Sequence, residues 1–384
     1  MKYQIGEICE IVSGSTPKTS IAEYWDGNVK WITPAELDDD SYVIQDTVRK
    51  ITELGVKKTG LTILPKGTVL FSSRAPIGKV AIAGCDMYCN QGFKNLICSD
   101  VINNKYLYWY LKSKTTYLNS LGRGATFKEL SKKILAEVEL EVPHIKRQNE
   151  IVQRLERLCS IKKKRLEQLQ KLDELIQARF VELFGEPILN PKEWKIVTIG
   201  DIALDVHYGT SRPAVEGGKY PYLRMNNLTI DGHLDLTDLK YIDIPEEELE
   251  KCVVRKGDIL FNRTNSLELV GKTAVFDLCE DMVIAGYIIR VRLNNKMILP
   301  EIFSQYMNHK TLKKILRGMA KGAVNQANIN AKELQSIKIY VPNMKLQDEF
   351  VTFVNQVNKS KVEIQQALEK TQLLFDSLMQ QYFG

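Results

Sequence analysis

Side chains with the types and spacing needed for catalysis are few in this sequence of 384 residues. None of its four histidines has a second histidine or a cysteine at metal-ligand spacing. Cys85 and Cys89 form one close pair without a second pair, so two free thiols are favoured over a zinc site. Gly271-Lys272-Thr273 has the form of a phosphate-loop end, but Ser266 stands where the upstream glycine is required, so a turn between strands is favoured.

One further segment is faintly similar to the catalytic motif of adenine methyltransferases, Asn-Pro-Pro followed by an aromatic residue. Asn190-Pro191-Lys192-Glu193-Trp194 lacks the second proline of that motif and directly follows a predicted helix end, where proline is common. We interpret it as a linker. A self-sufficient nuclease or methylase would need a catalytic motif that the sequence does not contain, so no catalysis is expected from this chain alone.

Polar and basic residues gather instead in glycine-containing loops of both halves of the chain. Arginine and lysine can bind phosphates or guanine, and asparagine and glutamine can pair with adenine. The candidates in the first half are Lys18, Ser72, Ser73, Arg74, Lys79, Asn90, Gln91, Arg123 and Thr126. Those in the second half are Arg212, Arg224, Asn226, Asn227, Arg263, Thr264, Lys272, Lys321, Asn325 and Gln326. For any single residue a solvated loop charge is an equally good interpretation, but the basic residues recur at matching places, which favours DNA binding.

The elements that would position these loops are repeated. Residues 143–185 and 342–384 align without a gap at an offset of 199. Each copy opens with the proline of a Val-Pro dipeptide, has a glutamine five residues after that proline, and ends in Phe-Gly. Neither has an internal glycine or proline before that end, which favours two long helices of roughly 58 Å.

The apolar residues of both copies alternate at spacings of four and three, which is typical of a coiled-coil seam. The predicted seam consists of Ile151, Leu155, Leu158, Leu169, Leu172, Ile176, Phe350, Val354, Val357, Ile364, Leu368 and Phe375. Two matching seams in one chain predict an intramolecular pair. Because the first helix leads away from the first block and the second helix returns from the second block, the pair is expected to be antiparallel.

The blocks before the two helices, residues 1–142 and 186–341, repeat the same order of turns, short strands and one helix. The second-block glycine pair Gly286-Tyr287 is aligned with Gly92-Phe93, and single helices are predicted over Tyr106–Leu118 and Glu301–Leu316. We therefore expect an α+β fold of two α/β domains joined by the two helices, in a pseudo-twofold circular arrangement.

Composition sets broad limits on location and partners. The net charge of +6 and the pI near 8.7 permit nucleic acid binding without requiring it. Seven scattered cysteines fit reduced thiols and a cytoplasmic location better than a disulfide framework. No run of about 18 apolar residues predicts a membrane span, and the first residues do not have the pattern of a secretion signal.

Several motifs resemble a known family over essentially the whole chain. The run from Tyr24 to Pro34, YWDGNVKWITP, resembles the opening signature of target-recognition domains in specificity subunits of type I restriction-modification enzymes. Three later motifs resemble further signatures of these domains, namely SSRAPIG at 72–78, NQGF at 90–93 and GATF at 124–127. The Val-Pro followed by a glutamine and a long helix is similar to the central spacer region of the family. The second block departs from the pattern, since Trp31 has no evident counterpart and Gly322–Gln326 replaces the Gly-x-Thr-Phe motif.

The resemblance implies a non-catalytic DNA-binding subunit of a phage-defence system. Residues 1–142 and 186–341 would be target-recognition domains that read the two halves of an asymmetric target in double-stranded DNA, and the helices would set the gap. Two methyltransferase subunits using S-adenosylmethionine, and motor-nuclease subunits using ATP and Mg²⁺, would be the partners. No cofactor is expected on this chain. The alternative is a coiled-coil scaffold or adaptor of a defence complex without sequence-specific DNA reading.

Overall fold

The computed structural model describes residues 1–124, 128–323 and 326–384 of the chain. The chain forms two compact units, each with its own hydrophobic core. The first unit joins Met1–Leu166 with Gln366–Gly384, and the second comprises Glu167–Gln365. The boundaries fall inside the two long helices, so each unit contains one α/β block and about half of each helix.

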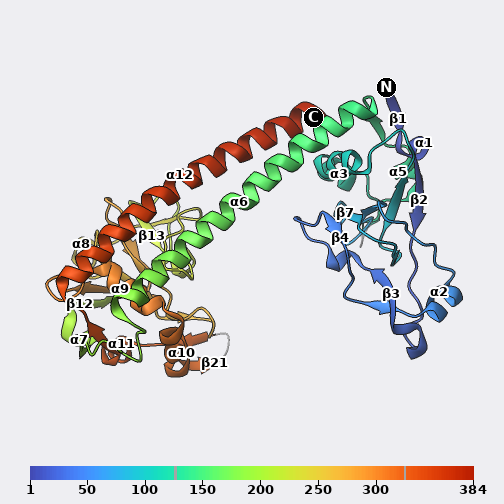
Figure 1. Ribbon diagram of the computed structural model, residues 1–384. Helices are drawn as coiled ribbons and strands as arrows, with labels where there is room; N and C mark the ends of the chain where they lie inside the picture. The colour runs from blue at the N-terminus through green and yellow to red at the C-terminus, as the bar shows by residue number, and fades with distance from the viewer. Residues whose placement is uncertain (125–127, 324–325) are drawn as a thin grey trace. The chain divides into compact units, whose positions relative to one another are not determined.

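Two helices of 40 residues follow the Val-Pro dipeptides, namely α6 (Ile145–Phe184) and α12 (Met344–Phe383). In Figure 1 they are the long green and red helices. Each starts two residues after its proline and ends at the phenylalanine of the Phe-Gly pair. The long uninterrupted helices predicted from the heptad spacing are therefore present, each shorter by a few residues than the repeat that contains it.

The repeated glutamine explains why both helices begin where they do. Gln148 is fully buried, donates to the carbonyl of Pro143 at 2.8 Å and accepts from the backbone N–H of Asn103 at 2.8 Å. Gln347 makes the same pair of bonds at the start of α12, at 2.8 and 2.9 Å. Each glutamine therefore ties the first turn of a long helix to the loop before a shorter helix of its block.

Side chains of α6 meet those of α12 in reverse order. In the first unit Arg154 donates to the hydroxyl of Tyr382 at 3.2 Å, and Arg165 bonds the hydroxyl of Thr371. The second unit continues this order with the pairs Asp173–Lys361 and Arg179–Glu349. The helices are therefore antiparallel, as predicted.

The side chains of the predicted seam are all buried or half-buried. The second unit packs Phe180, Phe184 and Phe350 edge to face, with ring centres 5.1 to 5.7 Å apart. Nearer the middle of the helices, the long side chains of Arg165 and Lys361 enter the seam and bond across it. Polar pairs across the seam therefore accompany its apolar packing.

The first unit contains three sheets that antiparallel and parallel pairings define. The main sheet has the order β2-β9-β6-β7-β4, with bounds Cys9–Ser13, Lys94–Cys98, Val69–Phe71, Val80–Ala83 and Val43–Ile44. A second sheet has the order β5-β3-β8, with bounds Lys50–Ile51, Trp25–Ile32 and Tyr88–Cys89. The pair β1 (Lys2–Gln4) and β10 (Glu139–Glu141) lies next to the start of α6 in the chain.

The second unit repeats these sheets with small changes. Its main sheet has the order β12-β20-β16-β18, with bounds Ala203–Tyr208, Ile288–Leu293, Ile259–Asn262 and Thr273–Val275. The next has the order β14-β13-β19-β15, with bounds Lys240–Ile242, Tyr220–Leu223, Met282–Ile284 and Val253–Val254. The remaining strands are β17-β22-β21 (Thr264–Asn265, Gln326–Asn328, Lys321–Ala323) and the pair β11 (Lys195–Thr198) and β23 (Lys338–Val341).

Short helices complete both blocks. Those of the first unit are α1 (Ile5–Ile8), α2 (Glu53–Thr59), α3 (Asn104–Ser113), α4 (Thr115–Ser120), α5 (Lys132–Ala136) and the 3-10 turns η1 (Ala22–Tyr24) and η2 (Pro34–Glu36). Those of the second are α7 (Ile199–Ile202), α8 (Glu246–Cys252), α9 (Pro300–Asn308), α10 (Lys310–Met319), α11 (Ala331–Ser336) and η3 (Met225–Asn227). The single helices predicted over Tyr106–Leu118 and Glu301–Leu316 were wrong. Each is broken in two, the second at His309, whose ring caps Thr311 N–H and so ends one helix and starts the next.

Candidate nucleic-acid interface

Loops of the first unit converge at one edge of its main sheet. Because β2, β9, β6 and β7 alternate in direction, the ends of β2 and β6 and the starts of β9 and β7 share that edge. Backbone bonds then tie the loops together. Ser15 N–H donates to Cys89 at 3.1 Å, Ser73 N–H to Gly92 at 2.8 Å, and Leu130 N–H to Ser73 at 2.9 Å.

The second unit builds the same edge with the same three bonds. Thr210 N–H donates to Ile284 at 2.9 Å, Arg263 N–H to Tyr287 at 2.9 Å, and Ile329 N–H to Arg263 at 2.9 Å. The bonding pattern makes Thr210 the counterpart of Ser15, and Arg263 the counterpart of Ser73. One backbone construction therefore carries two different sets of side chains.

These bonds correct one predicted correspondence and, for two arginines, the expectation that the basic residues recur at matching places. Tyr287 takes the place of Gly92, so the predicted alignment of Gly286-Tyr287 with Gly92-Phe93 is wrong by one residue. By the same register Thr264 takes the place of Arg74. The arginines of the two loops therefore do not match, and only the lysines that follow them, Lys79 and Lys272, are equivalent.

Among the first-half candidates, Lys18, Gln91 and Arg123 are exposed at this edge, and Arg74 and Asn90 are half-buried. Asn90 holds its own turn, because its side-chain oxygen accepts from Gly92 N–H at 2.9 Å. Thr126 lies outside the described residues.

Arg74 shares a carboxylate with a buried lysine that the sequence analysis did not select. Glu129 lies 3.7 Å from the Arg74 guanidinium and 3.0 Å from the ammonium of Lys94. The backbone of Glu129 also pairs with that of Arg123, at 3.0 and 2.9 Å. Glu129 therefore links the loop of Arg74 to the loop of Arg123, with more positive than negative charge around it.

Three first-half candidates face the protein interior. The Ser72 hydroxyl donates to the carbonyl of Pro76 at 2.8 Å, and the Ser73 hydroxyl donates to Gly92 at 3.1 Å. Both serines are fully buried. The ammonium of Lys79 donates to the carbonyl of Pro34 at 3.2 Å. Because these polar atoms are already used inside the domain, we assign the three side chains to loop support rather than to ligand contact.

In the second half, Arg212, Asn226, Lys321 and Gln326 are exposed and Arg224 is half-buried. Their cations are paired with carboxylates at the surface. Arg212 forms a two-pronged bond with Glu248 at 3.0 and 2.7 Å. The other ion pairs are Arg224–Asp238 and Lys321–Glu333. The candidate Asn325 lies outside the described residues.

Arg263 reaches across the loop edge. Its guanidinium lies 4.8 Å from the ring centre of Tyr208 and donates to the side-chain oxygen of Asn328 at 3.2 Å. Asn328 in turn donates to the hydroxyl of Thr264 at 2.8 Å. Thr264 is buried, so its hydroxyl serves this network, whereas Arg263 is only half-buried. Tyr208 and Asn328 were not predicted, since neither is distinctive in the sequence.

Two second-half candidates are also internal. Asn227 accepts from Arg224 N–H at 2.8 Å and donates to the carbonyl of Asp235 at 2.8 Å. Lys272 is 7% exposed, and its ammonium donates to the carbonyl of Met225 at 2.7 Å. Burial lowers the pKa of Lys272 below its usual value. The phosphate-loop interpretation of this lysine therefore has no support in its surroundings.

Tyr222 is the residue that the sequence analysis missed as the counterpart of Trp31. The Trp31 indole donates to the carbonyl of Ser15 at 3.1 Å, and the Tyr222 hydroxyl donates to the equivalent carbonyl of Thr210 at 3.3 Å. The prediction that Trp31 has no counterpart is therefore wrong. The sequence offered one indication of this equivalence, since both residues are aromatic and lie in a predicted short strand. The indication was missed because the spacing between motifs differs in the two blocks.

The described part of the chain offers little else that could hold a metal or bind a substrate. It contains no cluster of three or more histidine, cysteine, aspartate or glutamate side chains placed to hold a metal ion. Burial raises the pKa of the Cys89 thiol to about 12. Within the same described ranges, no helix combines the length and apolar character needed to cross a membrane.

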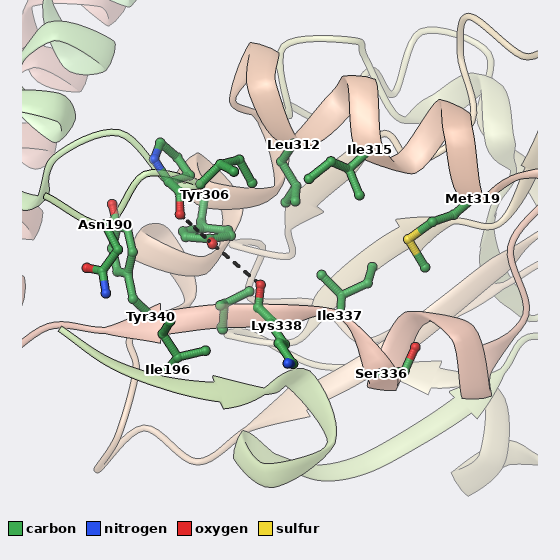
Figure 2. Close-up of a pocket in the computed structure, with 13 residues that line it drawn as sticks. Asn190, Ile196, Tyr306, Leu312, Ile315, Met319, Ser336, Ile337, Lys338 and Tyr340 are labelled. Carbon is green, nitrogen blue, oxygen red and sulfur yellow. Dashed lines mark hydrogen bonds between the residues drawn. The ribbon is translucent and has the colours of Figure 1, made fainter. Parts of the chain in front are cut away.

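A cavity of about 430 Å³ in the second unit is apolar and aromatic. Figure 2 shows Leu312, Ile315 and Met319 of α10 facing Ile337, with the Tyr306 hydroxyl close by. That hydroxyl donates to the carbonyl of Pro187 at 2.9 Å. With no cluster of ionisable groups in its lining, the cavity does not have the character of a catalytic centre.

Two equivalent domains with convergent loops, and an antiparallel pair of long helices, define a tandem-repeat α+β protein. The family model of the type I restriction modification DNA specificity domain matches residues 1–171 and 191–373. The chain belongs to this family. The two matches fall one in each half, as the repeat requires.

Curated relatives agree with this assignment. The MjaIX specificity subunit of Methanocaldococcus jannaschii is 40% identical over 249 residues, which span 59% of this chain and only 57% of that protein. The MjaVIII specificity subunit of the same organism is 22% identical over 96% of this chain and 89% of that protein.

A solved structure from a study of type I restriction-modification complex assembly aligns with all of this chain and 97% of its own, at a TM-score of 0.63 and 19% identity. The S subunit from M. genitalium aligns with all of this chain and 96% of its own, at a TM-score of 0.54 and 18% identity. These likenesses support the fold.

Proposed function

We propose that this protein is the non-catalytic DNA-recognition subunit of a type I restriction-modification enzyme. Residues 1–142 and 186–341 act as target-recognition domains, each reading one half of a split, asymmetric target. The duplicated loop edge carries this proposal, because the same three backbone bonds hold loops with different exposed side chains. Two domains of one construction thus present different chemistry, as two different half-sites require.

The surface side chains suit this role. Lys18, Gln91 and Arg123 in one domain, and Arg212 and Gln326 in the other, are exposed donors for phosphates or base edges. Family membership supports a shared assembly with other restriction-modification subunits. In this proposal two methyltransferase subunits bring S-adenosylmethionine, and motor-nuclease subunits bring ATP and Mg²⁺.

The test begins with methylome sequencing of a host that carries this chain and its partner methyltransferase. We expect one bipartite motif with an unread gap. The purified chain should then bind a duplex with that motif about 10³-fold or more tightly than a scrambled duplex, with affinity that falls steeply with salt.

Equal binding of target and scrambled duplexes would favour the scaffold alternative. Methylation by the isolated chain would contradict the non-catalytic assignment. A matched pair of variants shows which domain reads which half-site. Arg123→Ala and Arg212→Ala should each weaken binding to a different half-site. If both variants act on the same half-site, the assignment of one domain to each half is wrong.

A further inference from the structure

Trp31 and Tyr222 occupy the same position relative to the loop edge in the two domains. Trp31 precedes Ile32, which pairs with Cys89 of β8 in parallel. Tyr222 precedes Leu223, which pairs in parallel with Ile284 of β19. The exposed fractions of the two side chains are 2% and 5%. Each therefore brings a buried donor to the first loop of its domain.

In each domain two carbonyls of that loop accept from aromatic donors. In the first domain Trp31 bonds the carbonyl of Ser15, and the Trp25 indole donates to Lys18 at 3.2 Å. The two indoles pack edge to face, with ring centres 5.2 Å apart. The first loop is thus held at two points, three residues apart.

In the second domain one hydroxyl is shared between both carbonyls. Tyr222 lies 3.3 Å from the carbonyl oxygen of Thr210 and 3.1 Å from that of Arg212. Burial raises the pKa of Tyr222, so the hydroxyl keeps its proton and stays a donor. In both domains buried aromatic side chains therefore donate to two carbonyls of the first loop, although the residue types differ.

A close backbone approach also fixes the start of each loop. A Cβ atom on Gly14 would lie 2.2 Å from the carbonyl oxygen of Cys89, and one on Gly209 would lie 2.2 Å from that of Ile284. Glycine is therefore required where each loop leaves its sheet. The backbone approach at the glycine and the hydrogen bonds from the aromatic donors together clamp the segments Gly14–Lys18 and Gly209–Arg212.

We propose that Trp31 and Tyr222 are positioning residues that set how strictly each domain discriminates its half-site, by holding the first loop in the shape that presents Lys18 or Arg212. This inference rests on the proposed DNA-recognition function. The two residues do not contact DNA in this account. They act through the loop, so removing the donor should loosen discrimination at one half-site only.

Trp31→Phe and Tyr222→Phe test the proposal because each keeps an aromatic ring and removes the donor. With the full-length chain, affinity is measured for the target duplex and for duplexes altered in one half or the other. We expect Tyr222→Phe to reduce discrimination about tenfold at one half-site, as the loss of the hydroxyl shared by the two loop carbonyls allows. Trp31→Phe should do the same at the other half-site.

Tyr110→Phe and Tyr306→Phe are matched controls. Each removes a buried hydroxyl that donates to a backbone carbonyl outside the clamped segments, Glu139 at 2.8 Å and Pro187 at 2.9 Å. They should lower stability by a similar amount and leave discrimination unchanged. Trp31→Tyr supplies a hydroxyl like that of Tyr222, so this variant should retain discrimination. It provides the test for the first domain if Trp31→Phe does not fold.

The proposal is overturned if the folded variants keep wild-type discrimination at both half-sites, or lose it equally at both. It is also overturned if the control variants change discrimination as much. Failure of the underlying function looks different, because the wild-type chain itself would then bind target and scrambled duplexes alike.

Discussion

The ammonium nitrogen of Lys272 lies 2.7 Å from the carbonyl oxygen of Met225 and also bonds the carbonyl of Leu228. Lys79 holds the ends of η2 in the same way in the first domain. In each domain one lysine, half-buried in the first and buried in the second, thus closes a 3-10 turn next to the strand that carries the clamping aromatic residue. These two lysines match between the domains and are structural, whereas Arg123 and Lys321, which pair with the equivalent residues Glu129 and Asn328, match and are exposed.

Lys272→Met should lower the free energy of unfolding by about 1–3 kcal/mol, because two carbonyls would remain without their donor in a buried site. Urea unfolding of the full chain measures this. The exposed Lys256→Met is the control and should change stability by less than about 0.5 kcal/mol. If Lys272→Met instead kept full stability and lost salt-dependent DNA affinity, Lys272 would be a DNA contact.

Gln148→Ala should destabilise the start of α6 by about 2–4 kcal/mol, because buried donors and acceptors at Pro143, Val101 and Asn103 would lose their partner. Chemical unfolding of the variant gives the free energy. Gln153→Ala, at an exposed position of the same helix, should change little. Equal stability of both variants would mean that the glutamine does not secure the helix start.

Lys313 predicts a pH dependence of stability. Burial, then repulsion by Arg317 and Lys272, lowers its pKa from 10.5 to about 7. Between these values the unfolded chain binds more protons than the folded chain, so the free energy of unfolding rises with pH, by at most about 1.4 kcal/mol per unit. Unfolding curves from pH 7 to 10 should show this rise in the wild type.

Lys313→Met should flatten that rise, whereas Lys310→Met, at an exposed position of the same helix, should keep it. Parallel pH profiles for the wild type and Lys313→Met would show that this lysine keeps an ordinary pKa in the folded protein.

Glu248→Gln should increase affinity for DNA severalfold at low salt, because Arg212 would lose the carboxylate that now neutralises it. Arg212→Ala should weaken binding and reduce the slope of log affinity against log salt by about 0.9 if the side chain meets one phosphate. Filter binding over a salt series measures both. An unchanged slope in both variants would place Arg212 outside the DNA contact.

Removing one facing heptad from each long helix, residues 164–170 and 365–371, should shorten the antiparallel pair by about 10 Å. At ~3.4 Å per base pair, the unread gap of the target should shrink by about three base pairs. Methylome sequencing of a host with the shortened chain shows the new motif. A motif with the original gap would mean that the helices do not set the spacing.

The sequence alone was sufficient for the long helices and the repeat. The long helices were predictable because they depend on residues that are close in the sequence. These features are the heptad spacing, the absence of internal glycine and proline, and the glutamine after Val-Pro. The antiparallel pairing followed from chain order, and the family from motifs in a fixed order. The spacing did not reveal, however, that Arg165 and Lys361 bond across the seam, because those bonds depend on residues far away in the chain.

The tertiary structure decided which loop residues are surface and which are support. Lys79, Lys272, Ser72 and Ser73 have the composition of a DNA-binding loop, yet their polar atoms bond carbonyls of the protein itself, and all of these except the Pro76 partner of Ser72 are far away in the chain. Burial and hydrogen bonding depend on segments far apart in the chain, such as Lys272 and Met225, which local sequence does not bring together. For the same reason only the fold shows that Tyr222 stands where Trp31 does, because equivalence there is defined by the carbonyl that each side chain reaches.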